Sequence, residues 1–371
     1  MLDKPLELLQ PGCIRIGANQ AAQAKQWLSA RNLSRPIVIA DAFNAARLHV
    51  LGLEPADTCC ISVRPEPDLT DLNTAVSAAR DVKPDAVIGF GGGSAMDVAK
   101  LVSVMIDPSS AFEGISGLNR APSRDAALLQ IPTTAGTGSE AGTRALVTEP
   151  GTQRKIATES PHMLADMVIL DPELTVSLPA GVTAATGIDA LAHCVEAFTS
   201  RRAHPVIDHY ALEGIRLVGR FLPRAVRDGG DLEARAALLL ASFYGGVCLG
   251  PVNTTAGHAV AYPLGTRHHL PHGLANALIF PHVLAANAEH CREKTAHVAE
   301  ALGLSRNRPL AEAANDFCAG LGLKMRLRDH AVPENDLPEM AGEAHAIRRL
   351  LDYNPRDLSR SDILALYRAA Y

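Results

Sequence analysis

The sequence predicts two domains of different class, an α/β domain over residues 1–178 and an all-helical domain over residues 179–371. A chain of 371 residues exceeds the usual size of a single hydrophobic core, which favours two domains. In the first half, short apolar runs alternate with helical patterns, and beyond Pro172 runs of β-branched residues almost disappear. The apolar content of 47% and the charged content of 20% are typical of a globular protein.

Five apolar runs predict the strands of the first domain. They cover residues 36–41, 58–63, 85–90, 126–131 and 166–170, with helical patterns such as 19–31 and 70–82 between them. Apolar runs without alternation indicate strands that are buried on both faces. We therefore expect a parallel sheet that helices cover on both sides.

The second half predicts helices only. From about residue 180 it is rich in Ala and Leu with helical periodicity. Prolines stand at positions that suit helix starts or kinks, namely Pro179, Pro205, Pro223, Pro251, Pro271 and Pro281.

Composition excludes several classes of partner. A net charge of −5 without a basic cluster disfavours nucleic acid. No apolar run approaches the roughly 20 residues that cross a bilayer, and residues 1–7 lack the basic start of a signal peptide. Seven scattered cysteines without a Cys-x-x-Cys pair favour free thiols and hence a cytoplasmic location.

Two loops after predicted strands suit a dinucleotide. In residues 89–94, Gly-Phe-Gly-Gly-Gly-Ser, glycines let the backbone approach a phosphate, and the helix that follows offers free N–H groups. Such a turn can also be purely structural. Residues 132–140 form a second loop, rich in Thr and small residues that can bind phosphate and ribose oxygens. Together the loops predict a dinucleotide-binding domain.

Asp41 lies at the end of an early strand and bears on the choice of nucleotide. Its carboxylate could accept hydrogen bonds from the adenosine ribose and would repel a 2′-phosphate, which favours NAD over NADP. Alternatively, Asp41 is the N-cap of a helix that starts at Ala42. Both interpretations stay open.

Four residues of the second half predict a metal site. Asp189 and His193 are four apart in a helical segment, so they share one face. His258 and His272 follow in two further helices or at their ends. Each histidine alone would pass for a core or surface residue, but one carboxylate and three imidazoles together suit a divalent metal, iron or zinc. Beside a nucleotide, such a metal would act as a Lewis acid.

These segments resemble the iron-dependent (group III) alcohol dehydrogenase family. The matching motifs, in the family's order over about residues 10–371, are Gly91–Asp97, Pro132–Glu140, Gly187–His193, Pro271–Ala277, Pro281–Val283 and Asn354–Arg356. The resemblance implies the architecture that this family shares with dehydroquinate synthases. It places an N-terminal dinucleotide-binding domain before a helical one, with catalysis in the cleft between them.

The resemblance also implies roles for individual residues. Asp189, His193, His258 and His272 would hold the metal, commonly Fe(II) and sometimes Zn(II). Contacts to NAD(H) are implied for Gly92, Gly93, Ser94, Asp97, Thr133, Thr134, Thr137 and Lys155, although Lys155 could instead be a solvated charge. The implied reaction is hydride transfer between the nicotinamide and a small primary alcohol or aldehyde. The implied assembly is a homodimer or a higher homo-oligomer.

Tyr262 departs from the family pattern. Many members carry a second histidine four residues after the ligand that matches His258, and this chain has Tyr262 there. The phenol could relay a proton or simply pack against the nicotinamide ring. Because hydroxyacid–oxoacid transhydrogenases also carry a tyrosine here, that activity is an alternative. Glu196, one turn after His193, could support the metal site or lie exposed.

Arg144 is the second departure, because family members that act on neutral diols have a short polar residue there. Its guanidinium could bind an anionic tail, which predicts a substrate of the succinic semialdehyde or 4-hydroxybutyrate type. The alternative is an ion pair within the domain, and Arg348 and Arg349 are weaker candidates for the same role. Maleylacetate reductase-like activity is a further alternative. A dehydroquinate synthase-like lyase is disfavoured, because no cluster of basic and acidic residues surrounds His258–His272.

Overall fold

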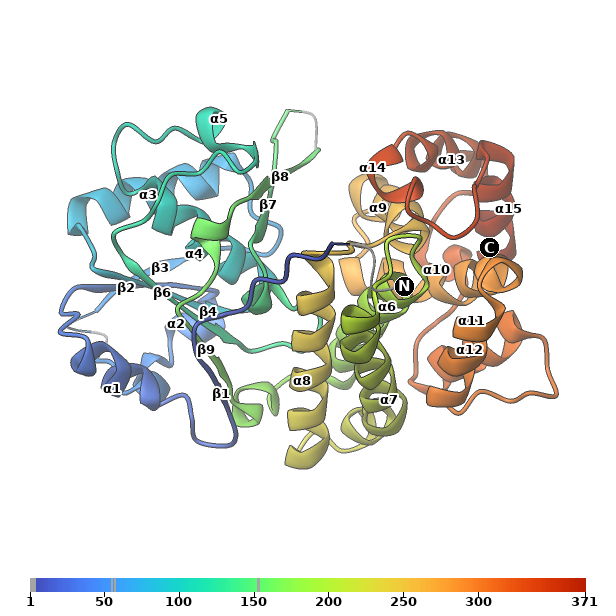
Figure 1. Ribbon diagram of the computed structural model, residues 1–371, viewed down its shortest axis with the longest axis horizontal. Helices are drawn as coiled ribbons and strands as arrows, with labels where there is room; N and C mark the ends of the chain where they lie inside the picture. Colours follow the sequence, from blue (N-terminus) through green and yellow to red (C-terminus); the bar gives the residue numbers. More distant parts are fainter. Residues whose placement is uncertain (1–4, 55, 57, 152–153) are drawn as a thin grey trace. The chain divides into compact units, whose positions relative to one another are not determined.

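The computed structural model describes residues 5–54, 56, 58–151 and 154–371 (Figure 1). The chain divides into two compact units between Val176 and Ser177, close to the boundary that the sequence places after residue 178. The first unit is Leu8–Val176. The second is Ser177–Tyr371, and the described residues 5–7 belong to it as well.

A six-stranded parallel sheet forms the centre of the first unit. Its strands are β1 (Ile14–Ile16), β2 (Pro36–Ala40), β3 (Cys59–Ser62), β4 (Ala86–Gly91), β6 (Ala127–Pro132) and β9 (Met167–Leu170). They run in the order β1-β9-β6-β4-β2-β3, and every neighbouring pair is parallel. The predicted parallel sheet is thereby confirmed, and each of the five apolar runs forms one of its strands.

Helices cover the two faces of this sheet (Figure 1). The α-helices of the unit are α1 (Gln23–Ala30), α2 (Ala42–Ala45), α3 (Leu69–Val82), α4 (Gly93–Met105) and α5 (Phe112–Ile115). Trp27 and Leu28 of α1 pack on one face, against strand residues such as Phe90 and Ile131. Helix α4 packs against β4 and β6, and it begins directly after β4 at the glycine-rich loop.

The sequence did not predict a second, three-stranded sheet in this unit. It contains β5 (Gly117–Leu118), β7 (Arg144–Thr148) and β8 (Lys155–Glu159) in the order β5-β8-β7. Strands β7 and β8 are antiparallel and place Arg144 opposite Glu159. These strands are only partly buried, so they lack the continuous apolar run that marks the larger sheet.

Among its described residues the second unit contains helices joined by turns and loops and no strand, as predicted. Its α-helices are α6 (Ala180–Thr199), α7 (Pro205–Arg227), α8 (Leu232–Leu249), α9 (Ala256–His268), α10 (His272–Asn287), α11 (Arg292–Ala301), α12 (Leu310–Gly320), α13 (Leu337–His345), α14 (Arg348–Leu351) and α15 (Arg360–Ala370). Short 3-10 helices complete the chain: η1 (Leu48–Leu51), η2 (Ser139–Ala141), η3 (Pro161–Met163), η4 (Pro172–Thr175), η5 (Ala288–His290), η6 (Leu327–His330) and η7 (Glu334–Asp336).

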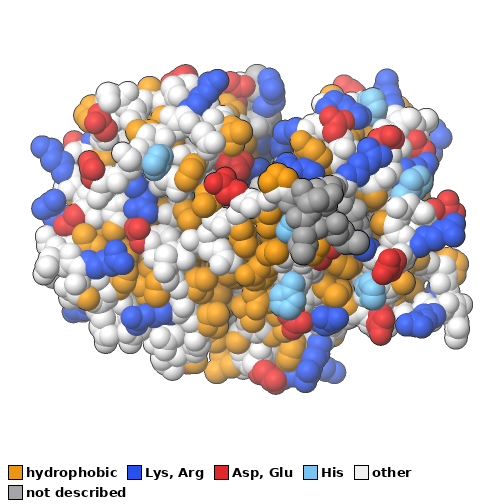
Figure 2. Space-filling model, in the orientation of Figure 1, with side chains coloured by type: hydrophobic (Ala, Val, Ile, Leu, Met, Phe, Trp, Pro, Cys, Tyr) orange, Lys and Arg blue, Asp and Glu red, His pale blue; other side chains and the backbone are white. Residues whose placement is uncertain are grey.

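Helix α8 is long and apolar enough to cross a membrane by length and composition alone. About two thirds of it, 67%, is buried, and it packs against α6 and α7, as a core helix does. Positive and negative side chains are interspersed over the face that Figure 2 shows, in keeping with the small net charge.

Candidate metal centre and nucleotide loops

Helix α6 supplies Asp189 and His193 from one buried face. The helix packs closely against α7 at Gly187. A Cβ atom at this position would lie only 2.4 Å from a methyl carbon of Leu222. Asp189 and His193 are only 2% and 5% exposed, although both are polar. Burial of a carboxylate and an imidazole side by side is costly unless they bind a partner, so this face of α6 is a candidate site.

Helices α9 and α10 bring two more imidazoles to Asp189. His258 is the third residue of α9 and His272 the first of α10, so both lie near helix starts, as predicted. Ligand atoms of Asp189, His258 and His272 all lie within 4.8 Å of one another. The Nε2 atoms of His258 and His272 lie 3.6 Å and 3.5 Å from Oδ1 of Asp189. The ring of His193 stacks on that of His258, with centroids 4.7 Å apart.

Glu196 fixes the orientation of His258. Its Oε1 lies 2.6 Å from Nδ1 of His258, and its Oε2 accepts hydrogen bonds from the backbone N–H groups of Thr255 and His258. Because Nδ1 is directed at Glu196, Nε2 is the ring atom that faces Asp189, 3.6 Å from its Oδ1. Of the two positions considered for Glu196, the structure therefore shows the buried one beside a predicted ligand.

Asn276, one turn after His272 on α10, was missed by the sequence analysis. Its Nδ2 donates to Oδ1 of Asp189 at 2.6 Å and lies 3.1 Å and 3.3 Å from Nε2 of His258 and His272. Three candidate ligand atoms thus surround one amide nitrogen, and the same carboxylate and imidazole groups suit a divalent cation. The donor set therefore fits a metal ion. The spacing of four residues from His272 is the signal that could have identified Asn276.

Charges within the cluster determine the protonation of its ligands. Burial by itself raises the pKa of Asp189, but the positive charge of His193, His272 and His258 outweighs it and holds that pKa far below its usual range. Burial lowers the pKa of His193 to about 4. Asp189 is therefore anionic and His193 neutral near pH 7, which are the forms that bind cations. Burial opposes protonation of His258, but the carboxylates of Glu196 and Asp189 outweigh it and raise the pKa of His258 to about 10, so a cation at this ring must displace a proton.

One side of the donor set is open to solvent. The side chain of His272 is 34% exposed, whereas those of Asp189 and His258 are each 3% exposed. The half-buried ring of Tyr262 stacks on His272 with centroids 6.0 Å apart and an angle of 27° between the planes. The guanidinium of Arg349 lies 5.8 Å from the centre of the Tyr262 ring. His272 and Tyr262 therefore form the accessible edge of the cluster.

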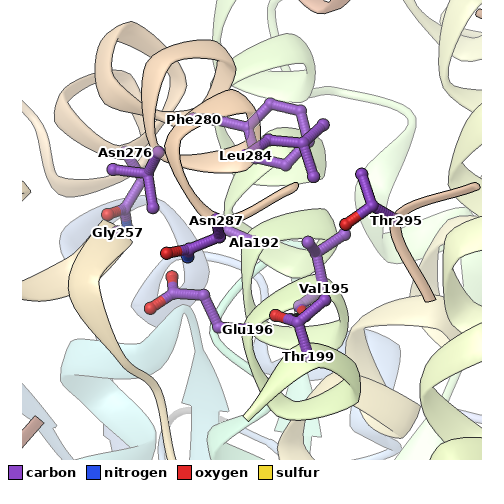
Figure 3. Close-up of a pocket in the computed structure, with 11 residues that line it drawn as sticks. Ala192, Val195, Glu196, Thr199, Gly257, Asn276, Phe280, Leu284, Asn287 and Thr295 are labelled. Carbon is purple, nitrogen blue, oxygen red and sulfur yellow. Dashed lines mark hydrogen bonds between the residues drawn. The ribbon is translucent and has the colours of Figure 1, made fainter. Parts of the chain in front are cut away.

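A separate cavity lies inside the helical unit (Figure 3). Glu196, Gly257 and Asn276 line one part of it, and apolar side chains such as Phe280 and Leu284 line another. Asp189, His193, His258 and His272 are not among the residues that line this cavity. The cavity therefore adjoins Glu196 and Asn276, which support the cluster, and is distinct from the accessible edge formed by His272 and Tyr262.

In the α/β unit, the two predicted nucleotide loops pack on each other at the start of α4. A Cβ atom at Gly93 would lie 2.8 Å from Cγ2 of Thr137, and one at Gly92 would lie 3.4 Å from Oγ1 of Thr134. A side chain at position 93 would therefore displace Thr137. Gly92 is the N-cap of α4, so this group of residues surrounds the electropositive end of a helix of 13 residues.

Asp97, Ser94 and Lys155 have partners within the unit. Oδ1 of Asp97 accepts from Oγ of Ser139 at 2.5 Å, and Oδ2 accepts from the backbone N–H of Leu146 at 2.9 Å. Asp97 therefore ties α4 to the second loop. Oγ of Ser94 accepts from the backbone N–H of Glu66, and Lys155 forms an ion pair with the carboxylate of Glu66.

Asp41 is the N-cap of helix α2, as the second of the two interpretations of this residue predicts. Its Oδ1 accepts from the backbone N–H of Asn44 at 3.0 Å, and its Oδ2 accepts from Nδ2 of Asn44 at 2.5 Å. Nδ2 of Asn44 also donates a hydrogen bond to Oγ1 of Thr133, at 3.2 Å. Through Asn44, Asp41 is connected to the second nucleotide loop.

Arg144 forms an ion pair within its own domain, which was the alternative to binding a substrate anion. Its Nη2 and Nε atoms lie 2.8 Å and 3.0 Å from Oε2 of Glu159, its cross-strand partner on β8. Both side chains are about a quarter exposed, at 28% and 23%. The positive charge of Arg144 is therefore balanced within its own sheet.

Comparison with known proteins accounts for both units. Residues 11–172 match the model of the iron-containing alcohol dehydrogenases, and residues 183–371 match that of the C-terminal part of the Fe-containing alcohol dehydrogenase family. The chain belongs to the iron-containing alcohol dehydrogenase family. It is therefore an oxidoreductase that acts on CH–OH groups, in a family whose members are linked to NAD.

Three relatives illustrate the range of this family. Long-chain-alcohol dehydrogenase 1 of Geobacillus thermodenitrificans (strain NG80-2) is 39% identical over 83% of this chain and 80% of its own length. The crystal structure of a 1,3-propanediol oxidoreductase superimposes with a TM-score of 0.90 at 30% identity, covering 99% of this chain and 100% of the other. Sulfoacetaldehyde reductase from Bifidobacterium kashiwanohense, solved with NAD+, also has a TM-score of 0.90, at 26% identity and 99% coverage of both chains.

Proposed function

We propose that this chain is a metal-dependent, NAD(H)-linked alcohol dehydrogenase that interconverts a small primary alcohol and its aldehyde. Asp189, His193, His258 and His272 hold the metal. The observation that carries this proposal is the convergence of Asp189, His258 and His272 on one point, with Asn276 already donating a hydrogen bond there.

Fe(II) is the proposed metal, and Zn(II) is the second candidate. Imidazole and carboxylate ligands suit both ions, and the family description supports iron. When bound, the cation supplies Lewis acidity to the oxygen of the reacting C–O group. Asp189 contributes negative charge, and Glu196 holds His258 in the tautomer that binds a metal.

Tyr262 is the proposed proton carrier. It lies beside His272 at the accessible edge of the donor set, where its phenol O–H can donate to or accept from a substrate oxygen. The hydride moves between C4 of the nicotinamide and the carbonyl carbon, so the proton on the alcohol oxygen is the only one that the protein must supply or remove.

NAD(H) is the proposed cofactor. The packed loops support a pyrophosphate site built from Gly92, Gly93, Ser94, Thr133, Thr134 and Thr137. Asp41 would accept from the ribose through the lone pairs that its cap leaves over, and its charge disfavours NADP. Asp97 and Lys155 complete the proposed site at its edges. The NAD+ complex of the sulfoacetaldehyde reductase supports this choice.

The proposed substrate is a short aldehyde that carries an acidic group, of the succinic semialdehyde and 4-hydroxybutyrate type. One relative is named for an anionic aldehyde, sulfoacetaldehyde, which supports this class. We also propose a cytoplasmic enzyme that forms a homodimer or a higher homo-oligomer. The cysteines of the described residues are all free, which supports a reducing compartment.

The test is reconstitution of metal-stripped protein with Fe(II) under anaerobic conditions, followed by NADH absorbance with succinic semialdehyde and with butyraldehyde. We expect oxidation of NADH with both, and faster oxidation with the acid. Failure to oxidise NADH with either, together with hydride exchange between a hydroxyacid and an oxoacid, would contradict the proposal and support a transhydrogenase.

A further inference from the structure

Arg349 is an exposed cation beside the accessible edge of the donor set. It lies on α14, which packs against α9, the helix of His258 and Tyr262 (Figure 1). Its guanidinium carbon is 5.8 Å from the centre of the Tyr262 ring. Within the described part of the chain, no carboxylate lies at ion-pair distance from Arg349.

The other arginines of this region are already paired. Arg348 binds Asp352, and Arg267 binds Glu339 and Glu343. Arg356, further along the chain, binds Asp362. Arg349 differs from all of these because its neighbour is an aromatic ring, and a contact between a cation and a ring at an exposed site is weak enough to give way to an anion.

The position of Tyr262 links Arg349 to the reacting end of the substrate. A carbonyl oxygen at the donor set must approach from the side of His272, because Asp189 and His258 are buried. Tyr262 stacks on His272 on that side, and Arg349 lies beside Tyr262. Arg349 is therefore a neighbour of the ring that borders this approach.

We propose that Arg349 selects the anionic group at the far end of the aldehyde, a carboxylate or a sulfonate. This inference rests on the proposed function. Arginine suits the role because its planar fork binds two oxygens of one anion and keeps its charge at all relevant pH values. The anion takes no part in the reaction, in which the carbonyl carbon receives a hydride from NADH and the oxygen receives a proton, giving the alcohol and NAD+.

Arg144, the residue that the sequence favours for this role, differs in one respect. Its guanidinium already binds Glu159 on the neighbouring strand, so a substrate anion would have to compete with a carboxylate of the protein. Arg349 has no such competitor among the described residues.

The experiment compares three variants by the ratio of kcat/KM for succinic semialdehyde to kcat/KM for butyraldehyde. R349A should lower this ratio about tenfold or more, mainly through the KM of the acid, because a charge-assisted hydrogen bond is lost. R349K should keep part of the preference. R348A is the matched control, since it removes an equal charge one residue away, and its ratio should stay within about twofold of wild type. Equal ratios for R349A and R348A would overturn the proposal.

A binding measurement separates this proposal from the proposed function. Calorimetry with 4-hydroxybutyrate and metal-loaded protein needs no hydride transfer. Loss of binding in R349A and retention in R348A supports Arg349 even if wild type oxidises no NADH, in which case the proposed function alone fails. Rapid turnover of both aldehydes, with 4-hydroxybutyrate bound equally by R349A and wild type, overturns Arg349 and leaves the dehydrogenase intact.

Discussion

Nδ1 of His258 lies 2.6 Å from Oε1 of Glu196, and both side chains are buried. The two residues come from α9 and α6, so one hydrogen bond connects two of the three helices that carry the candidate metal ligands. Because Nδ1 donates to Glu196, Nε2 is held as the atom available to a cation. Glu196 is thus a positioning residue that acts through His258.

The first prediction concerns the charge of Glu196. The E196Q variant keeps the shape of the side chain, but removes the negative charge that favours an Nδ1 proton on His258. We expect the affinity for Zn(II) or Fe(II) to fall about 10- to 100-fold, as measured by competition with a chromogenic chelator. T255A removes only a hydroxyl that lies 3.2 Å from Oε2 of Glu196, and it should change the affinity much less. Wild-type affinity in E196Q would show that His258 needs no such partner.

The second prediction displaces Glu196 without changing it. A Cβ atom at Gly257 would lie 2.5 Å from Oε1 of Glu196, which is the flexible end of that side chain. G257A should therefore fold and push the carboxylate away from His258, so that metal affinity falls while the melting temperature of the metal-free protein changes little. G250A is the control, because nothing lies within 4 Å of a Cβ atom there. The same metal affinity in both variants would contradict this geometry.

The third prediction concerns Glu140, which is 1% exposed in the α/β unit. Neither carboxylate oxygen has a hydrogen-bond partner in the described structure. Burial raises the pKa of Glu140 to about 7, and the charge of Lys100 opposes the shift only in part. Between the usual pKa of a glutamate and pH 7, the unfolded chain has lost this proton and the folded chain keeps it. The free energy of unfolding therefore falls as the pH rises through that window.

The E140Q variant should not show this loss. Its stability relative to wild type should rise between pH 5 and pH 8 by an amount on the order of 2–3 kcal/mol, which is the pKa difference expressed as free energy. Urea unfolding at the two pH values measures it. E113Q, at an exposed position on α5, is the control and should show no such change. A difference between E140Q and wild type that is independent of pH would mean that Glu140 is ionised throughout.

The fourth prediction decides between Arg144 and Arg349. With Glu159 as its partner, Arg144 should affect both aldehydes equally, so R144A should leave the ratio of kcat/KM for succinic semialdehyde and butyraldehyde unchanged. The variant should lose up to about 1 kcal/mol of stability, since a partly exposed ion pair contributes little. A ratio that falls in R144A and not in R349A would return the role to Arg144, as the sequence predicts.

The sequence predicted the elements that have strong local signals. The apolar runs of β2, β4 and β6 are continuous because both faces of the sheet are covered. Asp189 and His193 share a helix face by their spacing alone. Gly92 and Gly93 stand at the start of α4 because the chain must turn tightly between strand and helix.

Contacts between distant segments could not be read in the same way. The pairing of β7 with β8 sets Arg144 opposite Glu159, and nothing in either short segment specifies that register. Asn276 donates to Asp189 only because α10 packs against α6. From the sequence, Glu196 could either support the metal site or lie exposed. Its contact with His258 depends on where α9 begins, which the sequence does not specify.

The donor atoms of Asp189, His258 and His272 come from three different helices, α6, α9 and α10. A bound cation would therefore act as a cross-link between chain segments that are distant in sequence, in addition to its chemistry. Its removal leaves the packing of these helices to side-chain contacts and the hydrogen bonds of Glu196 and Asn276. Amide hydrogen exchange should then be fastest to respond at the first turns of α9 and α10, where the ligands lie.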